Sequence, residues 1–172
     1  MDGFDDVIQA YAASGSSVAR VGAAIDAYAA HTLHHTLCTI NRADTASMEL
    51  VRLYSSNPAA YPTGGRKSKR GTLWGQQVLV EKRAYVGEGE DAIRAAFDDH
   101  DLIIKLGLNS VINVPVVSQG NCLGTINLLM HDQTVTDEKL AFSRLLGLLV
   151  MPLLLQSSAD RTRAGLPPAQ PG

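Results

Sequence analysis

The sequence predicts an α+β domain, and three observations carry that prediction. Apolar residues recur at three- and four-residue spacing over residues 18–32, as in an amphipathic helix. Two stretches, residues 34–55 and 110–130, alternate in the manner of strands and each is broken by turn residues. A long apolar helical pattern closes the sequence. Two hairpins flanked and separated by helices are therefore expected.

Composition narrows the class of protein. The chain has 172 residues, a net charge of −2, a pI near 6.2 and 45% hydrophobic residues, as expected for one globular domain. This balance gives no general attraction to nucleic acid or to an anionic membrane. The N-terminus "MDGFDDVIQAY" lacks the pattern of a signal peptide, and two cysteines are too few for a disulfide framework. We expect a cytoplasmic protein that binds neither nucleic acid nor membrane.

The first half of the chain begins with a short helix over 4–13 and a second helix to about residue 32, capped by a serine of "SGSS". "HHTLCTINR" and "SMELVRLYSS" then alternate as a hairpin around "ADTA". Residues 55–71 show no periodicity, so a long loop is predicted there.

The second half begins with a helix from a Thr72 cap, followed by a short strand at "YVG" and one or two helices ending at Gly107. "SVINVPVV" and "CLGTINLLM" form a hairpin around "SQGN". A one-residue change of register would exchange the faces of Asn113 and Asn127, so the sequence leaves open whether they share a face. The last helix, capped by Thr134 or Thr136, is apolar on most of its circumference, which implies a partner helix.

The sequence resembles the GAF domain family in three stretches. They are "GLNSVINVPVVSQGNCLGTINLL", "WGQQVLVEKRAYVG" before it and "VTDEKLAFSRLL" after it. The resemblance covers residues 16–156, preceded by a helical extension over 1–15 and followed by a tail, 157–172, too poor in apolar residues to order. It implies a PAS-related central antiparallel sheet, terminal helices on one face and a small-molecule pocket on the other. It also implies a homodimer formed through the terminal helices.

The resemblance leaves several functions open, because one fold hosts many sites. The Asn-Lys-Phe-Asp-Glu type motif of cyclic-nucleotide-binding members is absent, and neither Cys38 nor Cys122 falls in the pocket-wall helices that bilin binding or methionine sulfoxide reduction would require. His100, in "DDHD", is the histidine in a plausible wall helix. It leaves open an axial haem ligand or an acid-base group, against the alternative of a charged helix surface.

The basic loop "GGRKSKRG" lacks the spacing of a phosphate-binding P-loop. Arg66 and Lys67 are predicted to contact an anion at the pocket edge, while Lys69 and Arg70 are expected to be exposed to solvent. The alternative is a loop in which all four side chains are solvated. Trp74 either stacks on a ligand or seals the core, and Tyr61 is either a lid residue or a surface tyrosine. His31, His34 and His35 lack acidic or cysteine partners at ligand spacing, so no metal site is predicted.

The sequence thus predicts a stand-alone module that binds a small anionic metabolite, works as a homodimer and acts through a regulatory partner protein. The alternative is a small enzyme or a haem protein that uses His100 in the same pocket. The predicted ligand-binding residues are Tyr61, Arg66, Lys67, Trp74, His100 and Asn113.

Overall fold

A six-stranded sheet divides the molecule into two layers. The computed structural model describes residues 3–163, and its strands lie in the order β3-β2-β1-β6-β5-β4 with every neighbouring pair antiparallel. The strands are β1 (Leu37–Asp44), β2 (Glu49–Ser55), β3 (Arg66–Ser68), β4 (Tyr85–Glu88), β5 (Ser110–Ser118) and β6 (Asn121–Met130). The predicted α+β class and antiparallel sheet are confirmed.

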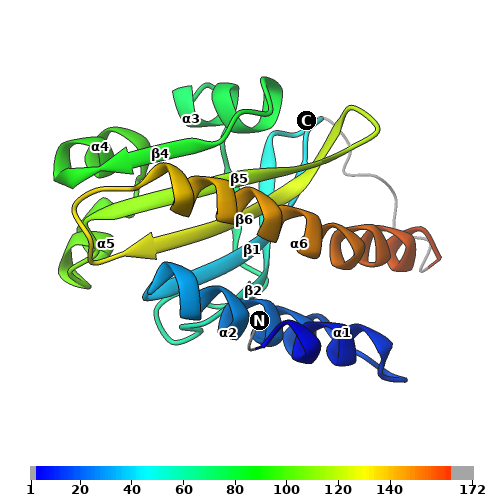
Figure 1. Ribbon diagram of the computed structural model, residues 1–172. Coiled ribbons are helices and arrows are strands. Elements are labelled where there is room, and N and C mark those ends of the chain that lie inside the picture. The colour runs from blue at the N-terminus through cyan, green and yellow to red at the C-terminus, as the bar shows by residue number, and fades with distance from the viewer. Residues whose placement is uncertain (1–2, 164–172) are drawn as a thin grey trace.

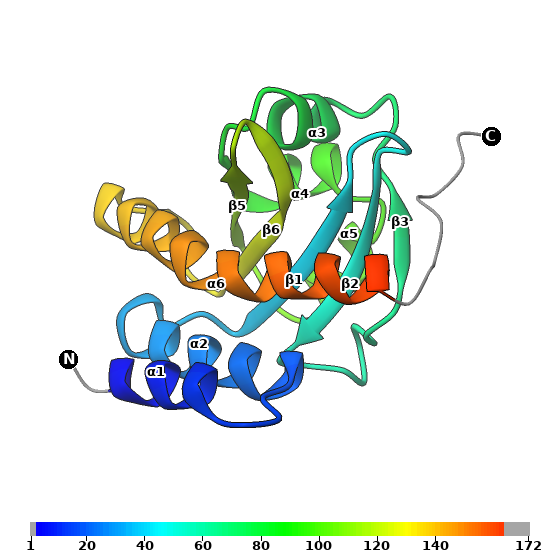
Figure 2. The same cartoon turned by 90° about the vertical axis from the view of Figure 1, so that its right-hand side faces the viewer.

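Terminal helices cover one face of the sheet. They are α1 (Phe4–Ala12), α2 (Val18–Leu33) and α6 (Asp137–Arg163). The mid-chain segments lie on the other face: α3 (Leu73–Gly75), a π-helical turn at Gln76–Val80, α4 (Gly89–Ala96) and α5 (His100–Lys105). Figures 1 and 2 show these two groups on opposite sides of the strands. The arrangement is the one that the GAF resemblance implies.

Local signals in the sequence produce most element boundaries. Ser17 caps α2 by accepting a hydrogen bond from the Arg20 backbone N–H, and Thr72 caps α3 by accepting one from Gly75. Thr136, of the two candidates, caps α6 through the Lys139 N–H. The second hairpin turns through Gln119 and Gly120, whose φ angles of 49° and 77° are the left-handed backbone conformation that a two-residue hairpin turn requires.

Alternation along the strands separates two cores. The helix face is lined by Cys38 and Ile40 of β1, by Ile126 and Leu128 of β6 and by their neighbours on β5, all packed against α1, α2 and α6. We call the opposite face, which carries Leu37, Thr39, Asn127 and Leu129, the pocket face. Consecutive residues therefore serve different layers.

Two predictions about order need correction. The predicted loop over 55–71 contains the edge strand β3, because Leu50 and Val51 of β2 supply backbone partners for Lys67 and Arg66. The predicted disordered tail begins too early, since α6 continues to Arg163. The rest of that predicted tail, 164–172, lies outside the described residues.

The closing helix belongs to the core. Within residues 3–163, α6 is the helix that is long and apolar enough to cross a membrane, because an 18-residue window within Asp137–Ala159 has a mean hydropathy of 1.6. One third of that window is buried, and Leu146, Val150 and Leu154 lie fully buried in the core of the helix face. It is a partly buried core helix packed on β5, β6 and α2.

Candidate functional site

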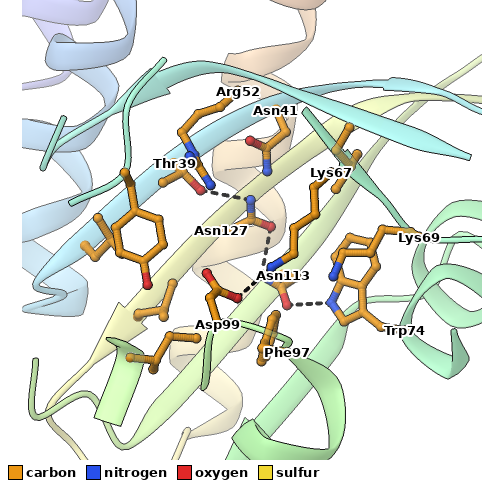
Figure 3. Close-up of a pocket in the computed structure, with 15 residues that line it drawn as sticks. Thr39, Asn41, Arg52, Lys67, Lys69, Trp74, Phe97, Asp99, Asn113 and Asn127 are labelled. Carbon is orange, nitrogen blue, oxygen red and sulfur yellow. Dashed lines mark hydrogen bonds and ion pairs between the residues drawn. The ribbon is translucent and has the colours of Figure 1, made fainter. Parts of the chain in front are cut away.

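A pocket lies between the pocket face of the sheet and the mid-chain segments (Figure 3). Its cavity volume is about 60 Å³, which is space for only a few heavy atoms and far below the roughly 300–1,000 Å³ of sites for drug-sized ligands. Apolar walls come from Leu37, Leu50, Phe97, Ile103 and Leu129. The remaining lining is polar or aromatic: Thr39, Asn41, Arg52, Tyr61, Lys67, Lys69, Trp74, Asp99, Asn113 and Asn127.

A chain of hydrogen bonds forms the floor of the pocket. Trp74 Nε1 donates to Asn113 Oδ1 over 2.8 Å, and Asn113 Nδ2 donates to Asn127 Oδ1 over 2.8 Å. Asn127 Nδ2 then donates to Thr39 Oγ1 over 3.0 Å. Asn113 pairs directly with Asn127 across β5 and β6, which settles the register that the sequence leaves open. The floor is rigid and its amides already have partners.

Three cationic side chains converge above this floor (Figure 3). Lys67 Nζ lies 2.6 Å from Asp99 Oδ1. Lys69 is 3% exposed, and its Nζ lies 5.0 Å from the centre of the Trp74 ring and 5.7 Å from that of Phe97. Arg52 stacks over Tyr61 at 5.1 Å, and its Nε is buried with no hydrogen-bond partner in the described structure.

The pocket is lined by more positive than negative side chains. Burial, reinforced by the charge of Lys67, lowers the pKa of Lys69 from its ordinary 10.5 to about 8. Burial also lowers the pKa of Arg52. Burial alone would raise the pKa of Asp99, but its hydrogen bond to Lys67 and the Lys67 charge lower it below its usual value. Asp99 is the carboxylate among the lining residues, so three cations face one anion.

The structure brings together four of the six predicted residues. Tyr61, Lys67, Trp74 and Asn113 line the pocket. Arg66 does not: it is exposed and pairs with Glu49 over 3.2 Å on the outer side of the sheet edge. Neighbouring residues of a strand point in opposite directions, so β3 cannot aim Arg66 and Lys67 at the same cavity.

His100 also lies outside the pocket lining. Its Nδ1 is 3.0 Å from Asp101 Oδ1 and 3.3 Å from Arg94, in a charged cluster on the surface of α5. Neither an axial haem ligand nor an acid-base group is supplied to the cavity from this position. Neither Cys38 nor Cys122 is among the lining residues described, so a thiolate nucleophile is not placed there either.

Several site residues were not predicted. Lys69, expected in water, is buried, whereas Arg70 is exposed as expected and donates to the carbonyls of Ala46 and Ser47. Lys69 lies two residues after Lys67, and side chains at this spacing in extended backbone point to the same face. The sequence would have shown this if 66–68 had been treated as a strand instead of a loop. Arg52, Asp99, Asn127 and Thr39 also come to the pocket through the tertiary fold.

Comparison with known proteins supports the fold. No protein-family model and no curated protein matches the sequence. Solved structures do match. The GAF domain of a phosphoenolpyruvate-protein phosphotransferase from Coxiella burnetii matches with a TM-score of 0.69 and 16% identity, over 96% of this chain and 98% of that chain. The GAF domain of the Acinetobacter phosphoenolpyruvate-protein phosphotransferase gives 0.69 and 14%, over 91% and 92%.

The free methionine-R-sulfoxide reductase of Neisseria meningitidis, solved with its substrate, matches with a TM-score of 0.65 and 20% identity, over 92% of this chain and 91% of that chain. Likeness at such low identity extends to the arrangement of helices and strands, and leaves the chemistry of the pocket to its own residues.

Proposed function

We propose that this chain, which has the fold of GAF domains, is a cytoplasmic regulatory module whose pocket binds a small anionic metabolite and which works as a homodimer. The observation that carries the proposal is Lys69. Its ammonium group is buried in the pocket with no carboxylate within ion-pair distance in the described residues. A buried unpaired charge is costly to keep, and an anionic ligand would neutralise it.

The neighbouring residues support a carboxylate or phosphate as the anion. Arg52 offers a guanidinium whose Nε has no partner, and guanidinium groups bind such oxyanions in a bidentate manner. Lys67 is already paired with Asp99, so it would exchange that partner for the ligand or share it. The small cavity favours a ligand of few heavy atoms, while Trp74 and Phe97 offer apolar contact.

Titration of small carboxylates and inorganic phosphate, followed by melting temperature and calorimetry, tests this proposal. We expect at least one compound to raise the melting temperature of the wild type, because ligand binding to the native state stabilises it. Lys69→Met should abolish the shift, whereas the matched control Arg66→Gln should retain it. An unchanged melting temperature across the whole panel, or an undiminished shift in Lys69→Met, would contradict the proposal.

An exposed apolar stripe on α6 supports the homodimer. Leu145, Leu148 and Leu155 are 58%, 61% and 46% exposed, and their three- and four-residue spacing through Pro152 places them along one side of the helix. A second copy that packs the same stripe against this one would bury it in a two-fold interface.

Sedimentation of Leu148→Glu tests the dimer. We expect a dimeric wild type and a monomeric variant, because a carboxylate at the centre of an apolar interface would be left without a partner. Leu73→Glu is the matched control: Leu73 is 91% exposed but lies on α3, on the other layer, and this change should leave the dimer intact. A monomeric wild type at micromolar concentration would rule the dimer out.

A further inference from the structure

A second cluster of reactive side chains lies on the helix face, apart from the pocket. Asp26 comes from the middle of α2, His35 from the junction after that helix, and Cys38 from the start of β1. One carboxylate oxygen, one ring nitrogen and one sulfur from these residues lie within 4.8 Å of one another. His34 adopts a left-handed conformation, with φ of 51°, which ends α2 and turns the chain back toward it.

Asp26 is held in place from two sides. His35 Nε2 lies 2.5 Å from Asp26 Oδ1, and the Tyr54 hydroxyl donates to Asp26 Oδ2 over 2.7 Å. Tyr54 reaches the helix face because a bulge interrupts the pairing of β1 with β2: Ile40 faces Tyr54 and Asn41 faces Arg52, which leaves Leu53 as the extra residue. The carboxylate is therefore positioned without the help of a bound ligand.

His35 is the incomplete member of the cluster. Its side chain is 2% exposed, and its Nδ1 is buried without a hydrogen-bond partner in the described structure. Buried polar atoms are nearly always paired, so the unpaired Nδ1, on a ring whose other nitrogen contacts Asp26, shows that this histidine lacks a partner. The Asp26 side chain, 17% exposed, is the most accessible of the three and leaves a route from solvent.

Cys38 is not suited to act as a free nucleophile. Burial, together with the negative charge of Asp26, holds the pKa of its thiol well above the ordinary value, so the sulfur carries its proton at neutral pH. A cation bound among the three side chains would reverse this preference, because coordination to a metal favours the thiolate.

We propose that Asp26, His35 and Cys38 bind a thiophilic divalent cation, of which Zn²⁺ is the representative case. Carboxylate, imidazole and thiolate are the protein ligands of zinc, and three of them leave a fourth position for water. Donor atoms around a tetrahedral zinc lie about 3.3–3.7 Å apart, so binding would have to open the 2.5 Å contact between His35 Nε2 and Asp26 Oδ1 by almost 1 Å. Binding forms the sulfur–metal bond and breaks the S–H bond, and the proton passes to solvent.

Cobalt binding to the purified full-length protein tests this site. Co²⁺ replaces Zn²⁺ in such sites and reports thiolate ligation as a sulfur-to-cobalt charge-transfer band in the near ultraviolet. We expect one Co²⁺ per chain, displaced by Zn²⁺, with release of at least one proton per ion. Cys38→Ser should eliminate the charge-transfer band, and His35→Gln or Asp26→Asn should weaken binding by tenfold or more. The matched control Cys122→Ser, at the other buried cysteine, should retain it.

Two results would overturn the proposal: absence of the charge-transfer band and of proton release in the wild type, or a band that survives Cys38→Ser and disappears in Cys122→Ser. Should Cys38→Ser fail to fold by circular dichroism, proton release and a zinc-dependent rise in melting temperature of the wild type, with their loss in His35→Gln, still decide the question. Lys69→Met should bind cobalt normally, which separates this site from the anion pocket.

Discussion

The two faces of the central sheet are built from the same strands and yet differ in almost every property. On the helix face, Ile126 and Leu128 of β6 are fully buried among the apolar side chains of the terminal helices. On the pocket face, Asn127, the residue between them, joins a chain of amides beneath three cations. One layer is closed and apolar, and the other is polar, charged and hollow.

The difference suggests a division in which one face of the sheet supplies stability and the other carries the proposed binding site. Apolar burial against α2 and α6 supplies the favourable free energy of folding, since each fully buried aliphatic side chain contributes about 1.5–3 kcal/mol. The pocket face can then hold Lys69 and Arg52 in unfavourable, partly unpaired positions. Groups poised for a ligand commonly reduce the stability of the ligand-free protein in this way.

The largest expected effects on stability come from substitutions at two neighbouring residues of β6, one on each face of the sheet. Leu128→Ala should lower the free energy of unfolding by about 2–5 kcal/mol, because it opens a cavity in the core of the helix face. Asn127→Ala should cost about 1–3 kcal/mol, because it leaves Asn113 without an amide partner but empties no apolar core. Urea unfolding of both variants measures the two costs. A larger cost at Asn127 than at Leu128 would break the proposed division.

Lys69→Met should raise the free energy of unfolding, whereas the two substitutions in β6 lower it. The folded-state pKa of about 8 lies below the ordinary 10.5, so between these values the unfolded chain binds more protons and native stability rises with pH. Below pH 8 the full penalty of the buried charge applies, roughly 3 kcal/mol, partly offset by contact with the aromatic rings. We expect the variant to be about 1–2 kcal/mol more stable at pH 7, with the gain fading from pH 8 to 10.5. Melting curves across this range check it.

Substitutions at surface residues outside the pocket should have the smallest effect on stability and on anion binding. Arg66→Gln and His100→Ala should each change the free energy of unfolding by no more than about 0.5 kcal/mol, since both side chains make their polar contacts at the surface. Neither change should alter anion binding in the calorimetric assay. A marked loss of binding in His100→Ala would instead bring that histidine back into consideration for the pocket.

The fold was largely predictable because its signals are local. Capping by Ser17, Thr72 and Thr136 and the glycine turn of the second hairpin each mark a boundary that the structure contains. The edge strand β3 was not predictable in the same way. Its residues Arg66–Ser68 have no apolar pattern of their own and extend only because β2 offers them backbone partners.

The candidate site was predictable only in part. Trp74 and Lys67 could be found from their residue types and their place next to the loop. The meeting of Asn113 with Asn127 depends on strand register, and the convergence of Arg52, Lys69 and Asp99 depends on how three segments distant in sequence pack. The proximity of Asp26, His35 and Cys38 depends likewise on a bulge and a left-handed helix end.

During synthesis, β1 cannot pair with β6 until the ribosome has translated the later strand. Arg42 pairs with Gly124, which leaves the ribosome 82 residues later, or about 4–16 seconds at ordinary rates of translation. During that interval the strand destined for the middle of the sheet is an open edge that exposes its backbone hydrogen-bonding groups. The β1–β2 hairpin must therefore wait for the second hairpin, and the delay exposes the nascent chain to aggregation and to capture by chaperones.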